Sequence, residues 1–485
     1  MTAQKTFNDL GLSPMLIEAI NRKGFEEPTA IQAMTIPALL TGKGNVIAQA
    51  QTGTGKTAAF GLPLIDMISA DSNAIQALVL VPTRELANQV AEEIESLRGK
   101  KRIGIVPIYG GQSFDQQLRM LKRGAHIVVG TPGRVIDHLE RKTLLIDKIS
   151  YLILDEADEM LNMGFIEDVE KIMKHTGPAK RTLLFSATMP DRIKELARKY
   201  MPEYELLCVK KEQLTTTLTR QIFYEVNADD KFEALCRLID FEKDFYGLVF
   251  CRMKCDVDEI AQHLFERGYS AEPLHGDISQ MQREKTLDKF KKKQINVLIA
   301  TDVAARGIDV SNLTHVVNFS LPQGPESYIH RIGRTGRAGN EGTAVTFITP
   351  SEHGRLMFIQ RLTKAEIKKA RVPSIHDIIE SKKNKIHDDI KAIIEKPISS
   401  HYRELAEKLL IDTDPQAVLA AILKYGFKNK LNPAAYREIK DYGERKPPFN
   451  RPGTAKPFVG YKRKEEAYPP RKHFERKPAG GGGHR

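Results

Sequence analysis

The sequence predicts an α/β protein built from two parallel-sheet domains in tandem, and three observations support this fold class. The chain has 485 residues, which is too long for a single hydrophobic core. Short apolar runs alternate with helix-like stretches, a pattern typical of parallel strands that are covered on both faces. The pattern stops near residues 202–217, which are typical of a linker, and then resumes.

The apolar runs form two series, one on each side of this linker. The first comprises residues 45–48, 77–81, 105–108, 126–129, 151–154 and 182–185, and the second 247–250, 272–274, 297–300, 315–319 and 344–348. Polar or glycine-bearing clusters follow the runs of the first series. Because the carboxyl ends of parallel strands meet at one edge of a sheet, where ligands bind, we expect these clusters to form one shared site.

A glycine-rich loop at residues 50–57 follows the first apolar run and leads into a helix. Such a turn directs several backbone N–H groups at one point, which suits the β- and γ-phosphates of a nucleotide. Lys56 would place a charge on these phosphates, and Thr57 would supply a hydroxyl ligand for Mg²⁺. The usual pattern begins with glycine, whereas this loop begins with Ala50. The alternative is a surface turn rich in glycine and threonine, which the intact Gly-Lys-Thr ending disfavours.

An acidic cluster at residues 155–158 follows another apolar run of the first series. Asp155, at a predicted strand end, can hold Mg²⁺ through water. Glu156 can orient or deprotonate the water that attacks the γ-phosphate. Acidic helix starts are common, so the position behind a strand is what favours the catalytic interpretation.

Two residues upstream of the loop, Phe7 and Gln32, suit an adenine base. A glutamine amide can donate to and accept from the adenine edge, and an aromatic ring can stack on the base. A turn at Pro28 followed by an amphipathic helix explains the same segment without a ligand, and the residues alone favour it.

The second series has no phosphate loop and carries arginines instead, at residues 305–309 and 330–337. Arg334 and Arg337 would reach the γ-phosphate held by the first domain and act as arginine fingers. The alternative is that Arg331, Arg334 and Arg337 form a solvated basic turn, which the glycines between them allow.

Composition limits the class of protein. Hydrophobic residues make up 41% and charged residues 28%, which is ordinary for a soluble globular protein. No apolar run has the roughly twenty residues needed to span a bilayer, and the start lacks an apolar secretory core. We therefore expect a cytoplasmic protein without membrane contact. The four cysteines form no Cys-x-x-Cys pair, so they indicate neither a zinc site nor disulfides.

Together these motifs closely resemble those of the DEAD-box ATP-dependent RNA helicases over roughly residues 5–360. The resemblance implies two RecA-like domains and the cofactors ATP and Mg²⁺; an initial Ala50 is normal in that family. It implies nucleotide binding by Phe7, Gln32, Gln51, Thr52, Gly53, Thr54, Gly55, Lys56, Thr57 and Asp309, and Mg²⁺ binding by Thr57 and Asp155. The implied catalytic residues are Lys56, Asp155, Glu156, Arg334 and Arg337, and Asp158, Ser186 and Thr188 would couple hydrolysis to unwinding.

The same resemblance implies an RNA-binding surface of backbone contacts. Its residues would be Pro82, Thr83, Arg84, Gly110, Gly111, Thr131, Pro132, Gly133, Arg134, Arg252, Gln280, Arg283, Thr301 and Asp302. Contacts of this kind carry no base information, so binding should be independent of sequence and sensitive to salt. Contacts to 2′-hydroxyls would favour RNA over DNA.

Three short helices are predicted after residue 363. The first follows Pro373-Ser374 and carries a stripe of isoleucines, the second contains Leu405 and Leu409, and the third begins at Asp414-Pro415 and stops at Gly426. The segment 364–430 resembles the dimerisation module of bacterial cold-shock DEAD-box helicases, which favours a homodimer. That resemblance also implies a role in the stress response to cold.

The last segment, 431–485, is predicted to be a flexible, disordered basic tail. Residues 440–485 contain thirteen Lys/Arg and five Asp/Glu, which gives a net charge of +8 out of +12 for the whole chain. Aromatic residues lie between these charges, a composition typical of RNA-binding arms. The alternative is a solubilising tail without a specific partner.

The predicted organisation is therefore a first RecA-like domain (1–206) that binds ATP, a linker (207–218), a second RecA-like domain (219–363), the helical module and the tail. The predicted function is local, ATP-driven unwinding of RNA, with partners expected among RNA-degradation or ribosome-assembly proteins. Two alternatives remain, an ATP-gated RNA clamp or scaffold and a DNA helicase or translocase.

Overall fold

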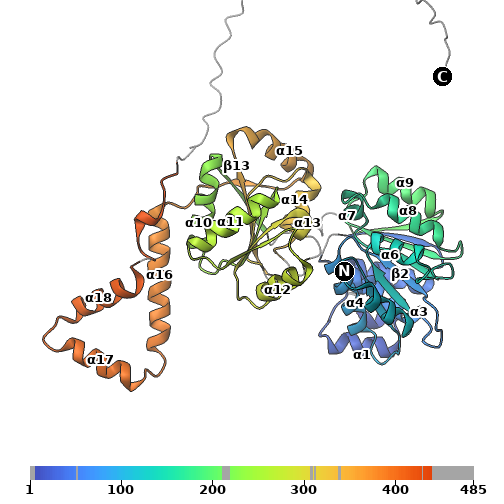
Figure 1. Cartoon of the computed structure of the whole chain (residues 1–485), viewed down its shortest axis with the longest axis horizontal. Helices are drawn as coiled ribbons and strands as arrows, with labels where there is room; N and C mark the ends of the chain where they lie inside the picture. Colours follow the sequence, from blue (N-terminus) through green and yellow to red (C-terminus); the bar gives the residue numbers. More distant parts are fainter. Residues whose placement is uncertain are drawn as a thin grey trace, which may run out of the picture. The chain divides into compact units, whose positions relative to one another are not determined.

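The computed structural model describes residues 6–50, 53–209, 219–305, 308, 310, 313–336, 340–428 and 430–439. Within them the chain forms two parallel sheets, each of seven strands (Figure 1). The strands of the first sheet are β1 (Asn45–Gln49), β2 (Ala77–Leu80), β3 (Ile105–Ile108), β4 (Ile127–Gly130), β5 (Tyr151–Leu154), β6 (Arg181–Ser186) and β7 (Tyr204–Cys208). They lie in the order β3-β4-β2-β5-β6-β1-β7.

Helices cover both faces of the first sheet. They are η1 (Phe7–Leu10), α1 (Pro14–Arg22), α2 (Ala30–Thr41), α3 (Lys56–Met67), α4 (Arg84–Leu97), α5 (Phe114–Lys122), α6 (Pro132–Glu140), α7 (Ala157–Asn162), α8 (Ile166–His175) and α9 (Asp191–Tyr200). Buried residues of α1 to α4 share one hydrophobic cluster with alternate strand residues, and those of α6 to α9 share a second. The fully buried strands explain the uninterrupted apolar runs of the sequence.

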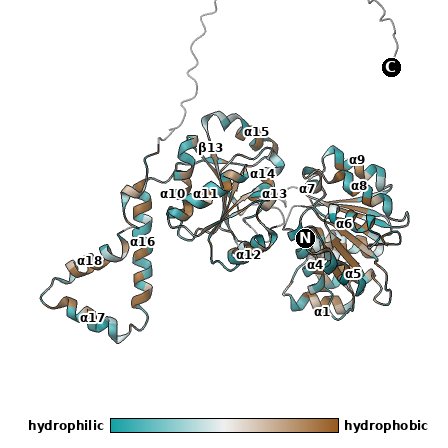
Figure 2. Ribbon diagram, viewed as in Figure 1, coloured by the Kyte–Doolittle hydropathy of each residue, from teal (hydrophilic) through white to brown (hydrophobic). Residues whose placement is uncertain are grey.

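The second sheet has the order β10-β11-β9-β12-β13-β8-β14. Its strands are β8 (Thr219–Glu225), β9 (Gly247–Cys251), β10 (Ala271–Leu274), β11 (Val297–Thr301), β12 (His315–Asn318), β13 (Gly342–Ile348) and β14 (Lys368–Lys369). Its helices are η3 (Ala228–Asp230), α10 (Lys231–Phe241), α11 (Lys254–Glu266), α12 (Gln280–Lys291), α13 (Asp302–Ala305), α14 (Pro325–Ile332), η4 (Pro350–Glu352) and α15 (His353–Thr363). Figure 2 shows hydrophobic residues along the strands of both sheets.

One outer strand of each sheet contains a proline. Pro107 lies in β3 and Pro273 in β10, and each of these strands is the terminal member of its sheet. A proline has no N–H to donate, so it is tolerated at a sheet edge and discourages the addition of another strand.

The structure differs from the predicted domain boundaries at the linker. β7 continues through Cys208, two residues beyond the predicted end of the first domain, and β8 begins at Thr219. Four of the five β7 residues are exposed, so this outer strand has no apolar run that the sequence pattern could reveal. Residues 210–218 lie outside the described residues.

The three helices predicted after residue 363 are present. They are α16 (Ile375–Ile394), α17 (Ser400–Leu410) and α18 (Pro415–Phe427). Ser374 caps α16 by accepting from Asp377 N, and Asp414 caps α18 by accepting from Ala417 N. No residue of α17 or α18 is buried, although Figure 2 shows hydrophobic segments on all three helices.

The chain then returns to the second domain through η5 (Pro433–Ala435), which corrects the predicted start of the tail at residue 431. Asp240 of α10 accepts hydrogen bonds from Tyr436 Oη (2.6 Å) and Tyr269 Oη (2.8 Å), and Lys382 Nζ of α16 lies 3.0 Å from it. Arg437 Nη2 lies 2.5 Å from an Asp230 carboxylate oxygen. The predicted basic stretch beyond residue 439 lies outside the described residues.

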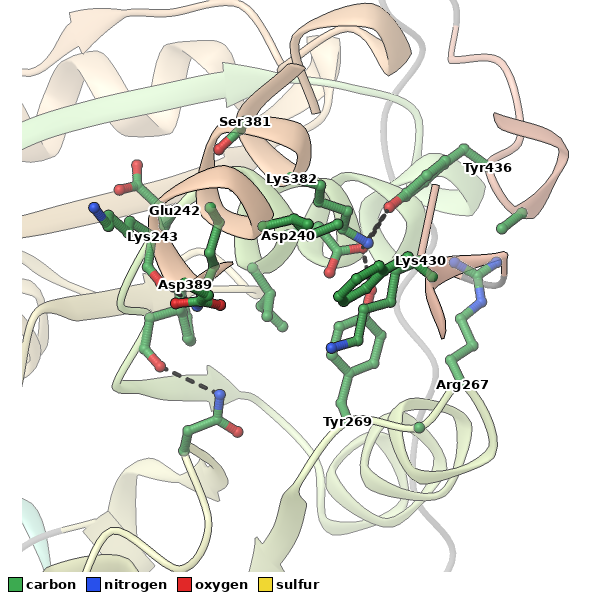
Figure 3. Close-up of a pocket in the computed structure, with 18 residues that line it drawn as sticks. Asp240, Glu242, Lys243, Arg267, Tyr269, Ser381, Lys382, Asp389, Lys430 and Tyr436 are labelled. Carbon is green, nitrogen blue, oxygen red and sulfur yellow. Dashed lines mark hydrogen bonds and ion pairs between the residues drawn. The ribbon is translucent and has the colours of Figure 1, made fainter. Parts of the chain in front are cut away.

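These contacts border a cavity of about 590 Å³ between the second domain and α16 (Figure 3). Asp240, Tyr269, Lys382 and Tyr436 lie on its wall. None of its lining residues belongs to the nucleotide or RNA sites that the sequence predicts.

Among the described residues, no helix has the length and apolar character to cross a membrane.

Arg181, at the start of β6, fixes the entry to β1 and thereby to the glycine-rich loop. Its guanidinium donates to the carbonyl oxygens of Gly44 (2.5 Å), Leu39 (2.7 Å) and Ala38 (3.0 Å). Two of these carbonyls, those of Leu39 and Ala38, belong to the last turn of α2, where helical donors run out; Ala38 O also accepts from Gly42 N (3.1 Å).

Replacing Arg181 with methionine should lower the free energy of unfolding by about 2 kcal/mol, because three carbonyl groups lose a charged donor. Urea unfolding of the full chain, followed by circular dichroism, measures this change. The control is Arg192→Met, which removes only a surface pair with Glu195 and should cost less than about 0.5 kcal/mol. Equal unfolding midpoints for the two variants would contradict the assigned role of Arg181.

Candidate active site

The glycine-rich loop joins the carboxyl end of β1 to the first residue of α3, Lys56. Gly53 and Gly55 have φ angles of 79° and 82°, a left-handed conformation that favours glycine. A Cβ atom on Gly55 would also overlap the Gln32 side chain. The loop therefore requires its glycines, as a phosphate-binding turn does; Gln51 and Thr52 lie outside the described residues.

Lys56 is 6% exposed, and its Nζ has no hydrogen-bond partner among the described residues. Burying an ammonium group without partners is costly, so this position favours an anionic ligand. The neighbouring Thr57 is half-buried and presents a hydroxyl from the same turn. The first turn of α3 therefore fits the phosphates of a nucleotide and one ligand of a bound cation.

Asp155 follows β5 at the same edge of the sheet and is 2% exposed. Burial raises the pKa of its carboxyl group to about 6; the charge of Lys56 opposes this shift, and the charge of Glu156 adds to it. The buried carboxyl group thus lacks full charge compensation within the protein. A divalent cation would supply it, so Asp155 and Thr57 fit a Mg²⁺ site.

Glu156 has a left-handed backbone, with φ 51° and ψ 50°, and is 8% exposed. For a residue that is not glycine this conformation costs about 1–3 kcal/mol and is concentrated at functional sites. Glu156 is the residue directly before α7, and its N–H donates to Asp155 Oδ1 (2.9 Å). The strained backbone marks Glu156 as the candidate catalytic base.

Gln32 contacts the glycine-rich loop itself. Its Nε2 donates to Gly55 O (3.1 Å), and its Oε1 accepts from Thr29 N (2.9 Å). Thr29 Oγ1 in turn donates to Thr54 O (2.8 Å). Residues 29–32 form the N-terminus of helix α2, as the interpretation without a ligand predicted. They also contact the glycine-rich loop. Phe7, by contrast, is 4% exposed and lies in the hydrophobic core.

Asp158, Ser186 and Thr188 contact one another, as predicted. Thr188 donates to Asp158 Oδ2 from its backbone nitrogen (2.8 Å) and its hydroxyl group (2.9 Å). Ser186 Oγ donates to Thr188 O (2.7 Å) and accepts from Asp158 N (3.2 Å). The acidic cluster after β5 is therefore joined directly to the segment after β6.

The residues predicted to contact RNA in the first domain lie on neighbouring loops. Thr83 caps α4 by accepting from Leu86 N (3.2 Å), and the guanidinium of Arg84 packs against Gly110 and Gly111. A Cβ atom on Gly111, which has a φ of 87°, would overlap Arg84. Pro82 is buried beside them.

The second loop precedes and begins α6. Thr131 is the residue before the helix, and Pro132 is its first residue. Thr131 and Pro132 are buried, Gly133 is exposed, and the side chain of Arg134 is 13% exposed. The structure thus brings the predicted first-domain residues to the strand ends where sequence analysis placed them.

The predicted second-domain residues differ in accessibility. Arg252 is exposed after β9, whereas Thr301, at the end of β11, is 8% exposed. Gln280 begins α12, and Arg283 of the same helix donates from Nη2 to Ala304 O (2.5 Å). Their positions follow the carboxyl ends of neighbouring parallel strands.

Arg331 is buried, and the sequence analysis missed its role. Its guanidinium holds both carboxylate oxygens of Asp302 (2.6 and 2.8 Å) and donates to Asn318 Oδ1 (3.0 Å). It also lies over the ring of Phe250, 5.0 Å from the centroid. Asp302, predicted to contact RNA, is therefore already paired within its own domain.

Arg334 is 8% exposed and donates from Nη1 to Ile308 O (3.0 Å). Burial of Arg331 and Arg334 shows that the alternative of a solvated basic turn was wrong for these two residues. Arg337 and Asp309 lie outside the described residues.

Comparison with known families assigns both domains. Residues 29–196 match the DEAD/DEAH box helicase family, and residues 230–339 match the helicase conserved C-terminal domain. The chain is 50% identical over 419 residues to the DEAD-box ATP-dependent RNA helicase CshA of Geobacillus kaustophilus, covering 86% of this chain and 90% of that protein. It is 48% identical over 423 residues to the CshA of Bacillus subtilis, covering 87% and 85%.

Solved structures share the arrangement. Saccharomyces cerevisiae Dbp5 bound to RNA and ADP BeF3 superposes with a TM-score of 0.71 at 32% identity, over 78% of this chain and 99% of that one. Mss116p bound to ssRNA and AMP-PNP gives a TM-score of 0.69 at 28% identity, over 89% and 92%. The predicted fold class, two RecA-like domains, is thereby confirmed. From its two matched domains and its relatives, the chain belongs to the DEAD-box ATP-dependent RNA helicases.

Proposed function

We propose that the residues around Lys56 and Asp155 carry out the ATP hydrolysis of this RNA helicase. The observation that carries the assignment is the buried, unpaired Lys56 ammonium at the same sheet edge as the buried Asp155 carboxyl group. Lys56 and the backbone of residues 51–55 bind the phosphates, and Thr57 and Asp155 hold Mg²⁺. When bound, Mg²⁺ supplies the positive charge that stabilises the phosphate oxygens.

Hydrolysis requires a water molecule positioned for attack on the γ-phosphate. Glu156, which follows Asp155 in a strained backbone conformation, orients this water and accepts its proton. Arg334 and Arg337 of the second domain stabilise the charge that develops on the phosphate. Asp158, Ser186 and Thr188 pass the change at the nucleotide to the RNA loops through their direct hydrogen bonds.

RNA binds through its backbone at the predicted loop residues of both domains. Glycines and threonines offer N–H and hydroxyl donors, and Arg84, Arg134, Arg252 and Arg283 offer positive charge, all without reading bases. Closure of the two domains on the strand bends it, and a bent strand cannot stay in a duplex. Unwinding is therefore local.

Phe7 and Gln32 complete the adenine site. Phe7 lies in the hydrophobic core, so its ring would contact the base after it gives up part of its contacts there.

The cellular role that we propose rests on the relatives. The CshA proteins suggest, by name alone, a function in cold adaptation, and RNA decay and ribosome assembly are processes that need local unwinding of RNA. Such work takes place in the cytoplasm. Clamping RNA for other proteins uses the same ATP-dependent closure and is the second candidate function.

Glu156→Gln should reduce kcat for ATP hydrolysis by about 100-fold or more while nucleotide still binds, because only the general base is lost. Lys56→Met should abolish both hydrolysis and binding. Hydrolysis is measured by phosphate release and binding by a fluorescent ADP analogue. The controls, Glu167→Gln and Lys43→Met, change exposed residues of the same domain and should behave as the unmodified protein. Substantial turnover in either active-site variant would refute the assignment.

Single-stranded RNA should stimulate ATP hydrolysis, and DNA of the same sequence and length should not, because the 2′-hydroxyl contacts are missing. Steady-state hydrolysis with each nucleic acid tests this prediction. Equal stimulation by DNA would favour a DNA helicase or translocase. Strand separation of a short RNA duplex distinguishes unwinding from a clamp, which would hydrolyse ATP and retain RNA without separating strands.

We propose further that residues 364–430 form a homodimer. Apolar side chains on the three helices and their connections are exposed: Ile393, Ile394, Ile398, Tyr402, Leu405, Leu409, Leu410, Ile411, Leu419, Ile422 and Tyr425. Single exposed apolar residues are normal, but a continuous set on three helices is typical of an interaction surface. A second copy of the module offers the same apolar stripe, so the two faces cover each other.

Leu405→Asp together with Leu409→Asp should convert the dimer to a monomer, because each new carboxylate would be buried without a partner. Light scattering after size-exclusion chromatography measures the mass. Lys408→Gln, on the same exposed helix, is the control and should leave the dimer intact. A monomeric mass for the unmodified chain at micromolar concentration would show that another protein covers this surface, such as a component of RNA degradation or ribosome assembly.

The basic segment beyond residue 439 is proposed to hold RNA outside the helicase site. The support is compositional, namely its net charge of +8 and the aromatic residues between the charges. A solubilising tail without a partner is the alternative.

A further inference from the structure

Gln117 lies in α5, between the two first-domain loops that we assign to RNA, and its side chain is completely buried. A glutamine amide has two donor hydrogens and two acceptor positions. Nε2 of Gln117 donates to Tyr109 O (2.8 Å) and to Gln112 Oε1 (2.9 Å). Oε1 accepts from Arg134 Nη1 (3.2 Å) and from His138 Nε2 (3.2 Å). All four positions are therefore used.

These four partners come from two separate segments of the chain. Tyr109 and Gln112 flank the Gly110-Gly111 turn after β3, whereas Arg134 lies in the first turn of α6 and His138 in its last turn. Arg134 Nη1 also donates to Gln112 O (3.4 Å), which closes a ring of contacts around the amide. One buried side chain thus sets the separation of the two loops and the direction of the Arg134 guanidinium.

His138 completes the arrangement and fixes the orientation of the amide. It is fully buried, stacks on Phe114 at 4.2 Å between ring centroids, and has Thr143 Oγ1 2.9 Å from its Nδ1. Burial lowers the pKa of His138 to about 4, and the positive charge of Arg134 contributes to this shift. The ring is therefore neutral at neutral pH. Because Oε1 of Gln117 can only accept, its hydrogen bond with His138 belongs to the tautomer that carries the ring proton on Nε2.

We propose that Gln117 is a positioning residue for RNA binding, which holds Arg134 and the Gly110-Gly111 turn at the spacing of neighbouring phosphates. The proposal rests on the RNA surface assigned above. Gln117 itself is buried and does not touch RNA; it acts through Arg134. A side chain that served only the core would not need to direct an arginine that remains 13% exposed.

The test compares Gln117→Met, which keeps the side-chain length and removes all four hydrogen bonds, with Arg134→Gln and with the double variant. Fluorescence anisotropy measures binding of labelled single-stranded RNA with a non-hydrolysable ATP analogue over a range of salt concentrations. Gln117→Met should weaken binding by about tenfold, comparable to the loss of one charge-assisted contact. It should also reduce the magnitude of the slope of log K, where K is the association constant for RNA, against the logarithm of the salt concentration. The expected reduction is about 0.7, the value for one phosphate contact on a single strand.

The double variant should show no further change in slope, because both single changes remove the same phosphate contact. Nucleotide affinity in the absence of RNA should remain that of the unmodified protein. The matched control is Gln116→Met, which alters the exposed neighbouring glutamine of the same helix. A purely structural role for Gln117 would lower stability and leave the salt slope unchanged, which would overturn the proposal.

Two outcomes separate this proposal from the RNA surface on which it rests. If Arg134→Gln leaves RNA binding and its salt slope unchanged, the assigned surface is wrong. If Arg134→Gln reduces both and Gln117→Met reduces neither, only the positioning role is wrong. Should Gln117→Met fail to fold, His138→Phe keeps the stacking on Phe114 and removes one donor to the amide. It should then produce a smaller loss of affinity in the same direction, and unchanged binding would contradict the proposal.

Discussion

A buried ammonium group and a buried carboxyl group at one edge of a parallel sheet are the feature on which the first domain depends. Lys56 and Asp155 are both nearly inaccessible; Lys56 Nζ has no hydrogen-bond partner among the described residues, and the Asp155 carboxyl group accepts one hydrogen bond, from Glu156 N (2.9 Å). Strands that are apolar on both faces make this possible, because a closely packed sheet holds the following loops rigidly. The stability lost at this edge is recovered when a nucleotide and its cation bind.

The sequence allowed the strands, the helix caps and the phosphate loop to be predicted because each depends on local patterns. Ser374 and Asp414 cap their helices as expected, since a cap needs only a short polar side chain and a following turn. Three strands were not predicted: β7 and β14 are exposed outer strands without an apolar run, and β8, Thr219–Glu225, mixes polar and apolar residues. Gln117 and Arg331 could not be assigned either, since their partners come from segments that only the folded sheet brings together.

The second domain contributes arginines in two different ways. Arg331 is a structural residue that neutralises Asp302 and joins α14 to the ends of β11 and β12. Arg334, one turn later, is also largely buried, and its Nη1 donates to the Ile308 carbonyl (3.0 Å). A rigidly held Arg331 therefore fixes the backbone from which Arg334 extends. The basic motif thus combines one residue that maintains the fold, Arg331, with another, Arg334, that we propose to contact the nucleotide.

Helix α16 is fastened to the second domain along its first half. Lys382 shares Asp240 with Tyr436, Ser381 donates to Phe241 O, and Lys385 donates to Lys243 O. The attachment continues into the second half of the helix, where Lys243 Nζ lies 2.9 Å from Asp388 Oδ2, whereas Ile393 and Ile394 near its end are exposed. The 20 residues of the helix extend about 30 Å. Because α16 is attached to the second domain, a rotation of that domain by about 10° displaces the far end of the helix by about 5 Å. A rotation of the second domain during the proposed ATP cycle would therefore also displace the surface that carries the exposed leucines.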